Sequence, residues 1–263
     1  MTIVFGAIAP HGDAAFVEGS PTRVAFEELG TRIERAGPDV TVVFTPHNVH
    51  VEGALAVVTA ATVAGSLDEP ALELQCPVDR ELSAAVLASL RAAGVPAVGI
   101  SYGSNDESLA VMPMDWGTLI PLWFLGGRRE GQRPIVVLSP ARDLPLAEHI
   151  RAGAAIADAC SGRKAAIVAS ADHGHAHVPD GPFGFHPAAA EFDARVVDLV
   201  RENRLGDTAE LESIVGVASA DSLWQLLLLH GALGGGFDVD FLSYERPTYF
   251  GMLCAAFEPR AAA

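Results

Sequence analysis

An apolar run opens the chain and leads directly into a histidine: Ile3-Val4-Phe5-Gly6-Ala7-Ile8-Ala9-Pro10-His11-Gly12. A short apolar run of this kind is typical of a buried β-strand. It has no basic start and continues straight into His11, so it indicates a first strand rather than a secretory signal. We therefore expect a cytoplasmic protein whose first strand ends at a histidine.

Further apolar runs alternate along the chain with helix-like segments. The first helix-like segment has Ser20 as its N-cap and Pro21 at its first helical position, and it ends before Gly37-Pro38. Alternation of this kind indicates an α/β fold with a largely parallel central sheet flanked by helices. We find no internal repeat or long linker, and predict a single domain over residues 1–263. The predicted strands are 3–9, 40–45, 55–62, 97–101, 135–139, 165–171, 239–244 and 249–257, and the predicted helices are 21–36, 79–93, 144–161, 188–203 and 222–233.

The composition argues against several kinds of partner and site. The formal charge is -16, with Lys164 the only lysine, so neither nucleic acid nor an anionic membrane would be attracted. No stretch approaches the roughly 20 apolar residues that a membrane span needs. Cys76, Cys160 and Cys254 are widely spaced and form no CxxC pair, which is typical of reduced, buried thiols. We expect no nucleic-acid partner, no membrane partner, no disulfide and no zinc ribbon.

Histidine clusters follow three of the predicted strands. They are Pro10-His11-Gly12, Pro46-His47-Asn48-Val49-His50 and Asp172-His173-Gly174-His175. In open α/β sheets the loops at the carboxyl ends of strands carry the site, so these clusters are expected to converge. Two histidines with one carboxylate and open positions are typical of non-haem Fe(II) oxygen chemistry. His47 and His50 compete for one role, because residues three apart on an extended chain point to opposite faces.

Five segments, taken in order, are similar to those of a known enzyme family. They are Ala9-Pro10-His11-Gly12, Thr45-Pro46-His47-Asn48, Pro113-Met114-Asp115-Trp116-Gly117-Thr118-Leu119-Ile120-Pro121-Leu122, Ala169-Ser170-Ala171-Asp172-His173-Gly174-His175, and the closing stretch from Tyr244-Glu245 to Phe257-Glu258. Over nearly its whole length the chain resembles the LigB-like catalytic subunits of class III extradiol ring-cleavage dioxygenases. The resemblance implies an Fe(II) enzyme that uses O2 to open an aromatic ring beside two hydroxyls, or beside a hydroxyl and an amine. It also implies a homo-oligomer, with a small partner subunit in some members.

The resemblance assigns roles to individual residues of this chain. His11 and His47 match the two iron-binding histidines of the family, and Glu245 best matches its iron-binding carboxylate. His175 matches the acid-base catalyst. An imidazole with an ordinary pKa of about 6.5 can take a proton from a substrate hydroxyl and return it later in the reaction.

Two departures from the family pattern bear on the substrate. Asp115-Trp116-Gly117 stands where many members have Asp-His-Gly, so a histidine that helps to orient substrate or oxygen is missing. His173 stands where an apolar residue is more common, and would either replace that imidazole as a second catalytic histidine or bond a backbone carbonyl. The residues predicted to contact substrate are His50, Asp115, Trp116, Arg246 and Tyr249.

Alternatives remain for the carboxylate and for the reaction. Glu245 could instead be a surface glutamate paired with Arg246, with Glu52 or Asp13 as the ligand. A chain in which Trp116 abolishes ring cleavage would be a fold relative that acts as a metal-dependent hydrolase or a binding protein. Gly99-Ile100-Ser101-Tyr102-Gly103 has the spacing of a hydrolase nucleophile elbow but lacks the helix that should follow it.

Overall fold

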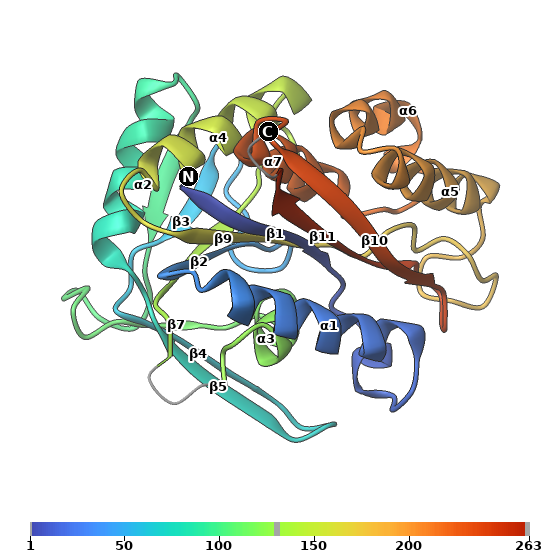
Figure 1. Cartoon of the computed structure of the whole chain (residues 1–263), viewed down its shortest axis with the longest axis horizontal. Coiled ribbons are helices and arrows are strands. Elements are labelled where there is room, and N and C mark those ends of the chain that lie inside the picture. Colours follow the sequence, from blue (N-terminus) through green and yellow to red (C-terminus); the bar gives the residue numbers. More distant parts are fainter. Residues whose placement is uncertain (1, 129–131, 261–263) are drawn as a thin grey trace.

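A computed structural model describes residues 2–128 and 132–260. An eight-stranded sheet forms the middle of the molecule, in the strand order β10-β11-β1-β9-β2-β8-β3-β6, and helices cover both of its faces (Figure 1). This arrangement confirms the predicted α/β fold with a largely parallel central sheet. The strands are β1 (Ile3–Ala9), β2 (Val40–Phe44), β3 (Leu55–Val58), β6 (Ala97–Ile100), β8 (Ile135–Ser139), β9 (Ala165–Ser170), β10 (Phe237–Glu245) and β11 (Met252–Pro259).

Parallel strands make up the centre of this sheet. β9 pairs in parallel with β1 on one side and with β2 on the other, and β2 pairs in parallel with β8. At one edge β11 runs antiparallel to both β1 and β10, and towards the other edge β3 runs antiparallel to β8. Because β1, β9, β2 and β8 run the same way, the loops that follow them leave from one end of the sheet.

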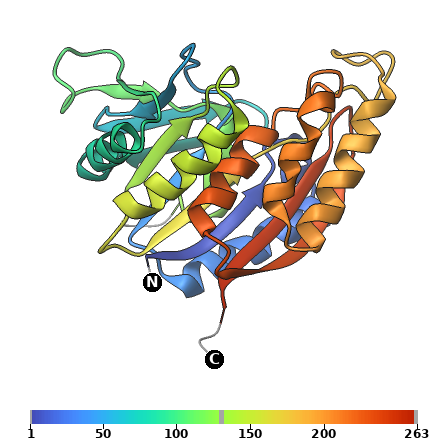
Figure 2. The same ribbon diagram turned by 90° about the horizontal axis from the view of Figure 1, so that it is seen from above.

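Alternating side chains of the strands bury two separate apolar cores. Val42 faces the core that contains α2 (Arg80–Ala92), α4 (Leu146–Ala159), α5 (Pro187–Arg201) and α7 (Leu223–Leu233), whereas Val43 faces the core beneath α1 (Pro21–Ala36) and α3 (Trp116–Phe124). Figure 2 shows the helices of the first layer lying side by side over the sheet. The short α6 (Glu212–Val215) and two 3-10 turns, η1 (Asp13–Phe16) and η2 (Leu205–Leu211), complete the described helices.

Helix α7 is apolar on every side and is buried along nearly its whole length, as expected for a helix enclosed by other elements. It packs closely against α4 through two glycines. A methyl group at Gly153 would overlap the Leu228 carbonyl oxygen, and one at Gly231 would overlap the Ile150 carbonyl oxygen. This contact fixes the position of α7 and therefore of the residues at its start.

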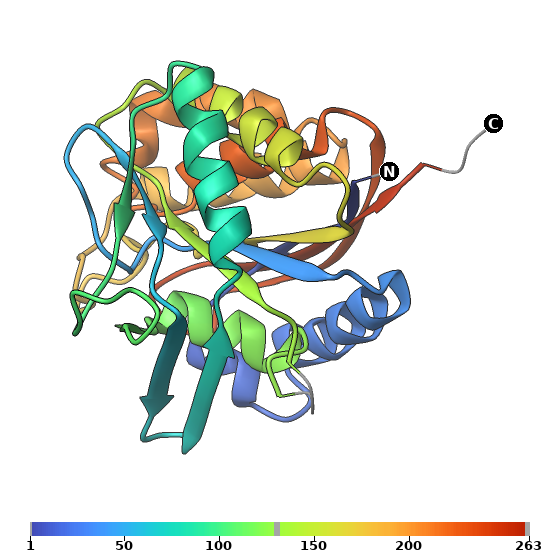
Figure 3. The ribbon, with the colours of Figure 1, turned by 90° about the vertical axis from the view of Figure 1, so that its left-hand side faces the viewer.

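The sequence prediction differs from the structure at 55–62. That run is not one strand, because β3 ends at Val58 and the chain then enters a second sheet of order β5-β4-β7, made of β4 (Thr62–Leu67), β5 (Leu72–Pro77) and β7 (Val111–Pro113). Figure 3 shows the β4–β5 hairpin projecting from the body. Helix α3 also lies where no helix was predicted. No helix in the described part of the chain is both long and apolar enough to cross a membrane.

Candidate metal centre

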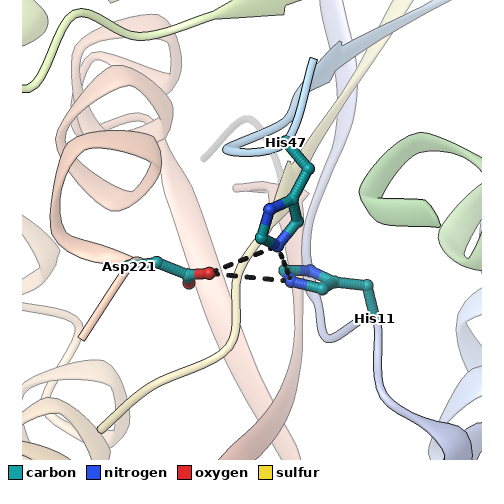
Figure 4. Close-up of side chains that lie close together, drawn as sticks. All are labelled: His11, His47 and Asp221. Carbon is teal, nitrogen blue, oxygen red and sulfur yellow. Dashed lines mark hydrogen bonds and ion pairs between the residues drawn. The ribbon is translucent and has the colours of Figure 1, made fainter. Parts of the chain in front are cut away.

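Three side chains from separate parts of the chain meet at the carboxyl end of the parallel strands. His11 follows β1, His47 follows β2, and Asp221 lies just before α7. Figure 4 shows the two imidazole rings and the carboxylate pointing toward a common point. His11 Nε2 lies 2.9 Å from His47 Nε2 and 3.7 Å from Asp221 Oδ2, and His47 Nε2 lies 3.5 Å from the same Oδ2.

Hydrogen bonds from β9 and the loop after it fix the His11 ring. Its Nδ1 lies 3.0 Å from the Ser170 hydroxyl, which turns Nε2 toward His47 and Asp221. Asp172 holds the same residue twice, because its Oδ1 accepts from the His11 backbone N–H at 3.0 Å and its Oδ2 lies 3.2 Å from Nε2. Buried outer partners of this kind set the orientation of a metal-binding imidazole.

The pKa values of the two histidines are shifted in opposite directions, that of His11 upward and that of His47 downward. Burial alone would lower the pKa of His11, but the Asp172 and Asp221 carboxylates outweigh it and raise the pKa to about 9. Burial and the positive charge of His11 lower the pKa of His47 to about 4. Burial would raise the pKa of Asp221, but its hydrogen bond to His11 and the His11 charge bring that pKa below its ordinary value. Without a metal ion, the positive charge of this group therefore lies on His11, beside the buried carboxylates of Asp172 and Asp221.

The donor set and its spacing fit a metal ion. His11 Nε2 can carry only one hydrogen, yet His47, Asp172 and Asp221 each place an acceptor atom near it. The second oxygen of Asp221 is buried and has no hydrogen-bond partner among the described residues. Ligand atoms about 2.1 Å from one ion lie roughly 3.0–3.6 Å apart at angles of 90–120°, close to the separations seen here. His11, His47 and Asp221 could thus bind a cation together.

A cavity of about 460 Å3 opens onto this group. His175 lines it with a half-buried ring that stacks on Phe250 at 5.2 Å between centroids and approaches Tyr249 at 5.9 Å. Burial lowers the pKa of His175, although the nearby Asp221 carboxylate opposes that shift. The ring is therefore neutral near pH 7 and able to accept a proton. Trp116 lines the same cavity, and its ring stacks on His47 at 4.2 Å.

Comparisons with known proteins agree with this architecture. The sequence pattern of one family, described as the catalytic LigB subunit of aromatic ring-opening dioxygenase, matches residues 7–253. The chain belongs to this family. A similar fold is seen in the crystal structure of the uncharacterized protein JW3007 from Escherichia coli K12, which is 18% identical to this chain; the TM-score is 0.68, and the match covers 96% of this chain and 99% of that one.

A curated relative of this LigB-family chain is longer. Protein CA_C1420 of Clostridium acetobutylicum is 21% identical over 231 residues, which make up 85% of this chain and 49% of that protein. The chain thus spans about half the length of the curated relative that it matches.

Asp221, and not the predicted Glu245, is the carboxylate beside the two histidines of this LigB-family chain. Glu245 lies at the end of β10, where its Oε1 accepts a hydrogen bond of 2.8 Å from the Thr22 backbone N–H in the first turn of α1. Its carboxylate is thus used to satisfy a free N–H of a helix start. The structure brings His11 and His47 together as predicted, but with a different third residue.

The other predicted site residues divide into two groups. Trp116, His175 and Tyr249 line the cavity. Asp115 does not line it: its carboxylate caps α3 by accepting from Thr118 N at 3.0 Å, and it also accepts from the Thr45 hydroxyl at 2.5 Å. Arg246 is exposed and outside the cavity lining, and His50 belongs to a neighbouring cavity.

His173 lies behind the site and not in it. Its ring is fully buried, and Nδ1 lies 3.0 Å from the hydroxyl of Ser222, the residue after Asp221. Its Nε2 has no hydrogen-bond partner among the described residues, and burial lowers the pKa of the ring. The contact with Ser222 places His173 as a support for the start of α7, whereas the sequence suggested a second catalytic histidine.

Sequence reasoning missed Asp221 because the residues around it carry no ligand motif. The segment Ala218-Ser219-Ala220-Asp221-Ser222 precedes an apolar helix and follows no strand, so the strand-end rule does not point to it. The available signal was an aspartate placed directly before a helix that is apolar on all sides, where a charged residue must find a buried partner.

Proposed function

We propose that this protein is a non-haem Fe(II)-dependent extradiol dioxygenase, which opens the ring of a catechol-type or aminophenol-type substrate and incorporates both atoms of O2. One observation carries the proposal: two histidines and one aspartate, His11, His47 and Asp221, face a cavity on whose wall a neutral histidine, His175, also lies. Two histidines with one carboxylate and open positions are the donor set typical of Fe(II) oxygenases. Membership of the LigB family supports the same reaction class.

The three ligands would hold a ferrous ion with a net positive charge, because they comprise two neutral imidazoles and one anion. When bound, the iron would supply positions for two substrate oxygens, or for an oxygen and a nitrogen, and for O2. The Ser170 hydroxyl at Nδ1 and the Asp172 carboxylate at the backbone N–H would keep His11 in place while its Nε2 binds the ion.

His175 would act as the acid-base group that takes a proton from the substrate and returns it. Its half-buried ring lies on the cavity wall and is held by the backbone bond from His175 N to the Ala218 carbonyl, 2.9 Å long. Because burial lowers its pKa, the imidazole is free to accept a proton from a substrate hydroxyl and to return it when the ring opens. Trp116, Phe250 and Tyr249 line the cavity and supply flat apolar surfaces against which an aromatic ring would pack.

A second function is favoured by one observation. Trp116 is 48% exposed and stacks on His47, at a position where many family members place a histidine. If that imidazole is indispensable for ring cleavage, the same centre would serve a metal-dependent hydrolase or a binding protein. Tightly bound zinc, in place of catalytically active iron, would favour this alternative.

Oxygen consumption tests the proposal. The protein is loaded anaerobically with Fe(II), mixed with a panel of catechols and aminophenols in aerated buffer, and followed with an oxygen electrode and by the absorbance of yellow ring-opened products. His11→Ala and His175→Ala should abolish turnover, whereas His186→Asn, which changes an exposed histidine that caps α5, should not. Full iron occupancy without oxygen uptake for any compound would contradict ring cleavage and favour the alternative.

A further inference from the structure

A second cavity adjoins the one that contains the metal centre. Its volume is about 480 Å3, and Arg142, which follows β8, lines both cavities. β8 pairs in parallel with β2, so its following loop lies beside the His47 loop at the same end of the sheet. The second cavity is lined by Pro46, His50, Ser139, Pro140, Arg142 and Asp143. A molecule bound at the metal centre could therefore extend past Arg142 into this space.

The positive charge of Arg142 is not neutralised by an acidic side chain. None of the described residues forms an ion pair or a side-chain hydrogen bond with it, and its guanidinium lies 4.9 Å from the centroid of the Trp224 ring. The neighbouring carboxylate of Asp143 is engaged elsewhere, since its Oδ2 accepts from the Gly53 backbone N–H at 2.7 Å. Stacking on an aromatic face orients the guanidinium while leaving its N–H donors free.

Other donors accompany Arg142 in the second cavity. Ser139 is 4% exposed, and its hydroxyl has no hydrogen-bond partner among the described residues. His50 presents an exposed imidazole on the same lining. An unpaired guanidinium beside a free hydroxyl and an imidazole forms a donor set suited to a carboxylate.

The acidic residues of the first cavity would direct the carboxylate of a bound ligand away from themselves and toward Arg142. Asp13 and Glu69 line that cavity together with the two carboxylates of the centre, and Arg142 is the one arginine or lysine among the described residues that line either cavity. A carboxylate placed near Asp13 or Glu69 would be repelled, whereas at Arg142 it would be attracted, with Asp143 the one opposing carboxylate among the described residues that line the second cavity.

We propose that the second cavity binds an acidic side chain of the aromatic substrate, with Arg142 as the cation that pairs with its carboxylate. This inference rests on the proposed function and narrows its substrate class to catechols or aminophenols that carry a flexible anionic substituent. The aromatic ring of the substrate occupies the first cavity, and its acidic side chain extends past Arg142 into the second cavity. Arg142 is thus a specificity-determining residue.

Anaerobic calorimetric titration of the Fe(II)-loaded protein tests the proposal. The probes are 3-(3,4-dihydroxyphenyl)propanoate and its neutral counterpart 4-ethylcatechol, with 3-phenylpropanoate as an acid that lacks both hydroxyls. Arg142→Met keeps the aliphatic stem and removes the charge, Arg142→Lys keeps the charge, and Arg246→Met is a matched control at an exposed arginine that lines neither cavity.

If Arg142 forms a charge-assisted hydrogen bond with the ligand carboxylate, Arg142→Met should raise the Kd of both acids by about tenfold to a hundredfold. The Kd of 4-ethylcatechol should change by no more than about twofold. Arg142→Lys should recover part of the lost affinity for the acids, and Arg246→Met should leave the affinities for the acids and for 4-ethylcatechol unchanged. Equal affinity of the unaltered protein for the acid and the neutral catechol, or an equal loss for both in Arg142→Met, would overturn the inference.

Oxygen uptake with 4-ethylcatechol separates this inference from the proposed reaction. Binding of 3-phenylpropanoate that depends on Arg142, in a protein that oxidises no catechol, would support the acid site and contradict ring cleavage. Turnover of 4-ethylcatechol with no effect of Arg142→Met on any acid would support ring cleavage and overturn the acid site.

Discussion

A buried carboxylate on α5 holds the loop that carries His175. Asp193 is 2% exposed and accepts three hydrogen bonds, from Gly174 N at 2.7 Å, from His177 Nε2 at 2.9 Å and from the Tyr244 hydroxyl at 2.7 Å. A methyl group at Gly251 would overlap the same carboxylate, so the loop between β10 and β11 also packs against it. Three segments that border the cavity therefore meet at one side chain.

We expect Tyr244→Phe to weaken this junction by a measurable amount. Burial and the adjacent Asp193 carboxylate raise the pKa of the Tyr244 hydroxyl above its ordinary value, so the hydroxyl remains a donor. Removing one hydrogen bond to a buried charged group costs about 1.5–3 kcal/mol of unfolding free energy. Since each kcal/mol shifts Tm by roughly 2–4 °C in chains near this length, Tm should fall by about 3–12 °C.

Urea unfolding followed by circular dichroism measures the free energy, and a thermal scan measures Tm. Tyr102→Phe is the matched control, because Tyr102 is 62% exposed and the same hydroxyl is removed at the surface, where the change should stay within about 0.5 kcal/mol. Asp193→Asn should cost more than Tyr244→Phe, because it replaces the charge that all three donors face. A loss for Tyr244→Phe no larger than that for Tyr102→Phe would refute the reasoning, since the hydroxyl would then be contributing nothing beyond what water supplies.

Three further predictions concern the metal, pH and packing. Asp221→Ala should weaken Fe(II) binding by more than the roughly tenfold to hundredfold that loss of an outer partner costs. Glu245→Ala should retain the metal and lose about 1–3 kcal/mol of stability, because the Thr22 N–H in the first turn of α1 loses its partner while Ser20 still caps the helix. Metal analysis after desalting and urea unfolding decide this, and loss of metal from Glu245→Ala alone would reverse the assignment. Burial lowers the pKa of His149, so on acidification the unfolded chain binds a proton at this residue before the folded chain does. The unfolding free energy should therefore fall as pH drops below about 6.5, by at most about 1.4 kcal/mol per pH unit for this group. His149→Leu should make the unfolding free energy depend less on pH, and an unchanged dependence would exclude His149 as its source. Gly153→Ala should destabilise the protein by about 1–3 kcal/mol or more, because the methyl group meets the Leu228 carbonyl, although alanine is otherwise the better helix former; a stabilised variant in urea unfolding would show that α4 and α7 can separate without cost.

The sequence alone indicated most of the strands of a largely parallel central sheet and two histidine clusters at strand ends, and the family resemblance selected His47 over His50. Strand-like runs such as 3–9 and 165–171 have a local composition that favours buried strands wherever they occur, and the polar residue at the end of each run is next to it in sequence. Parallel strands place such ends together, so the clusters that contain His11 and His47 are expected at one site, and the resemblance selects His47 within its cluster. The family resemblance, confirmed over residues 7–253, rests on the same local segments.

Only the tertiary structure decided the third member of the centre. Asp221 and Glu245 are both acidic residues in the last quarter of the chain, and neither has a neighbour in sequence that marks it as a ligand. Their roles depend on where α7 and β10 pack: the α4–α7 contact brings the start of α7 to the two histidines, while β10 brings Glu245 to the start of α1. The division of 55–62 between two sheets has the same origin, because an extended segment has the same local pattern whichever strand it pairs with. Local chemistry thus fixed which residues could be ligands or strands, and packing between distant elements fixed which of them met.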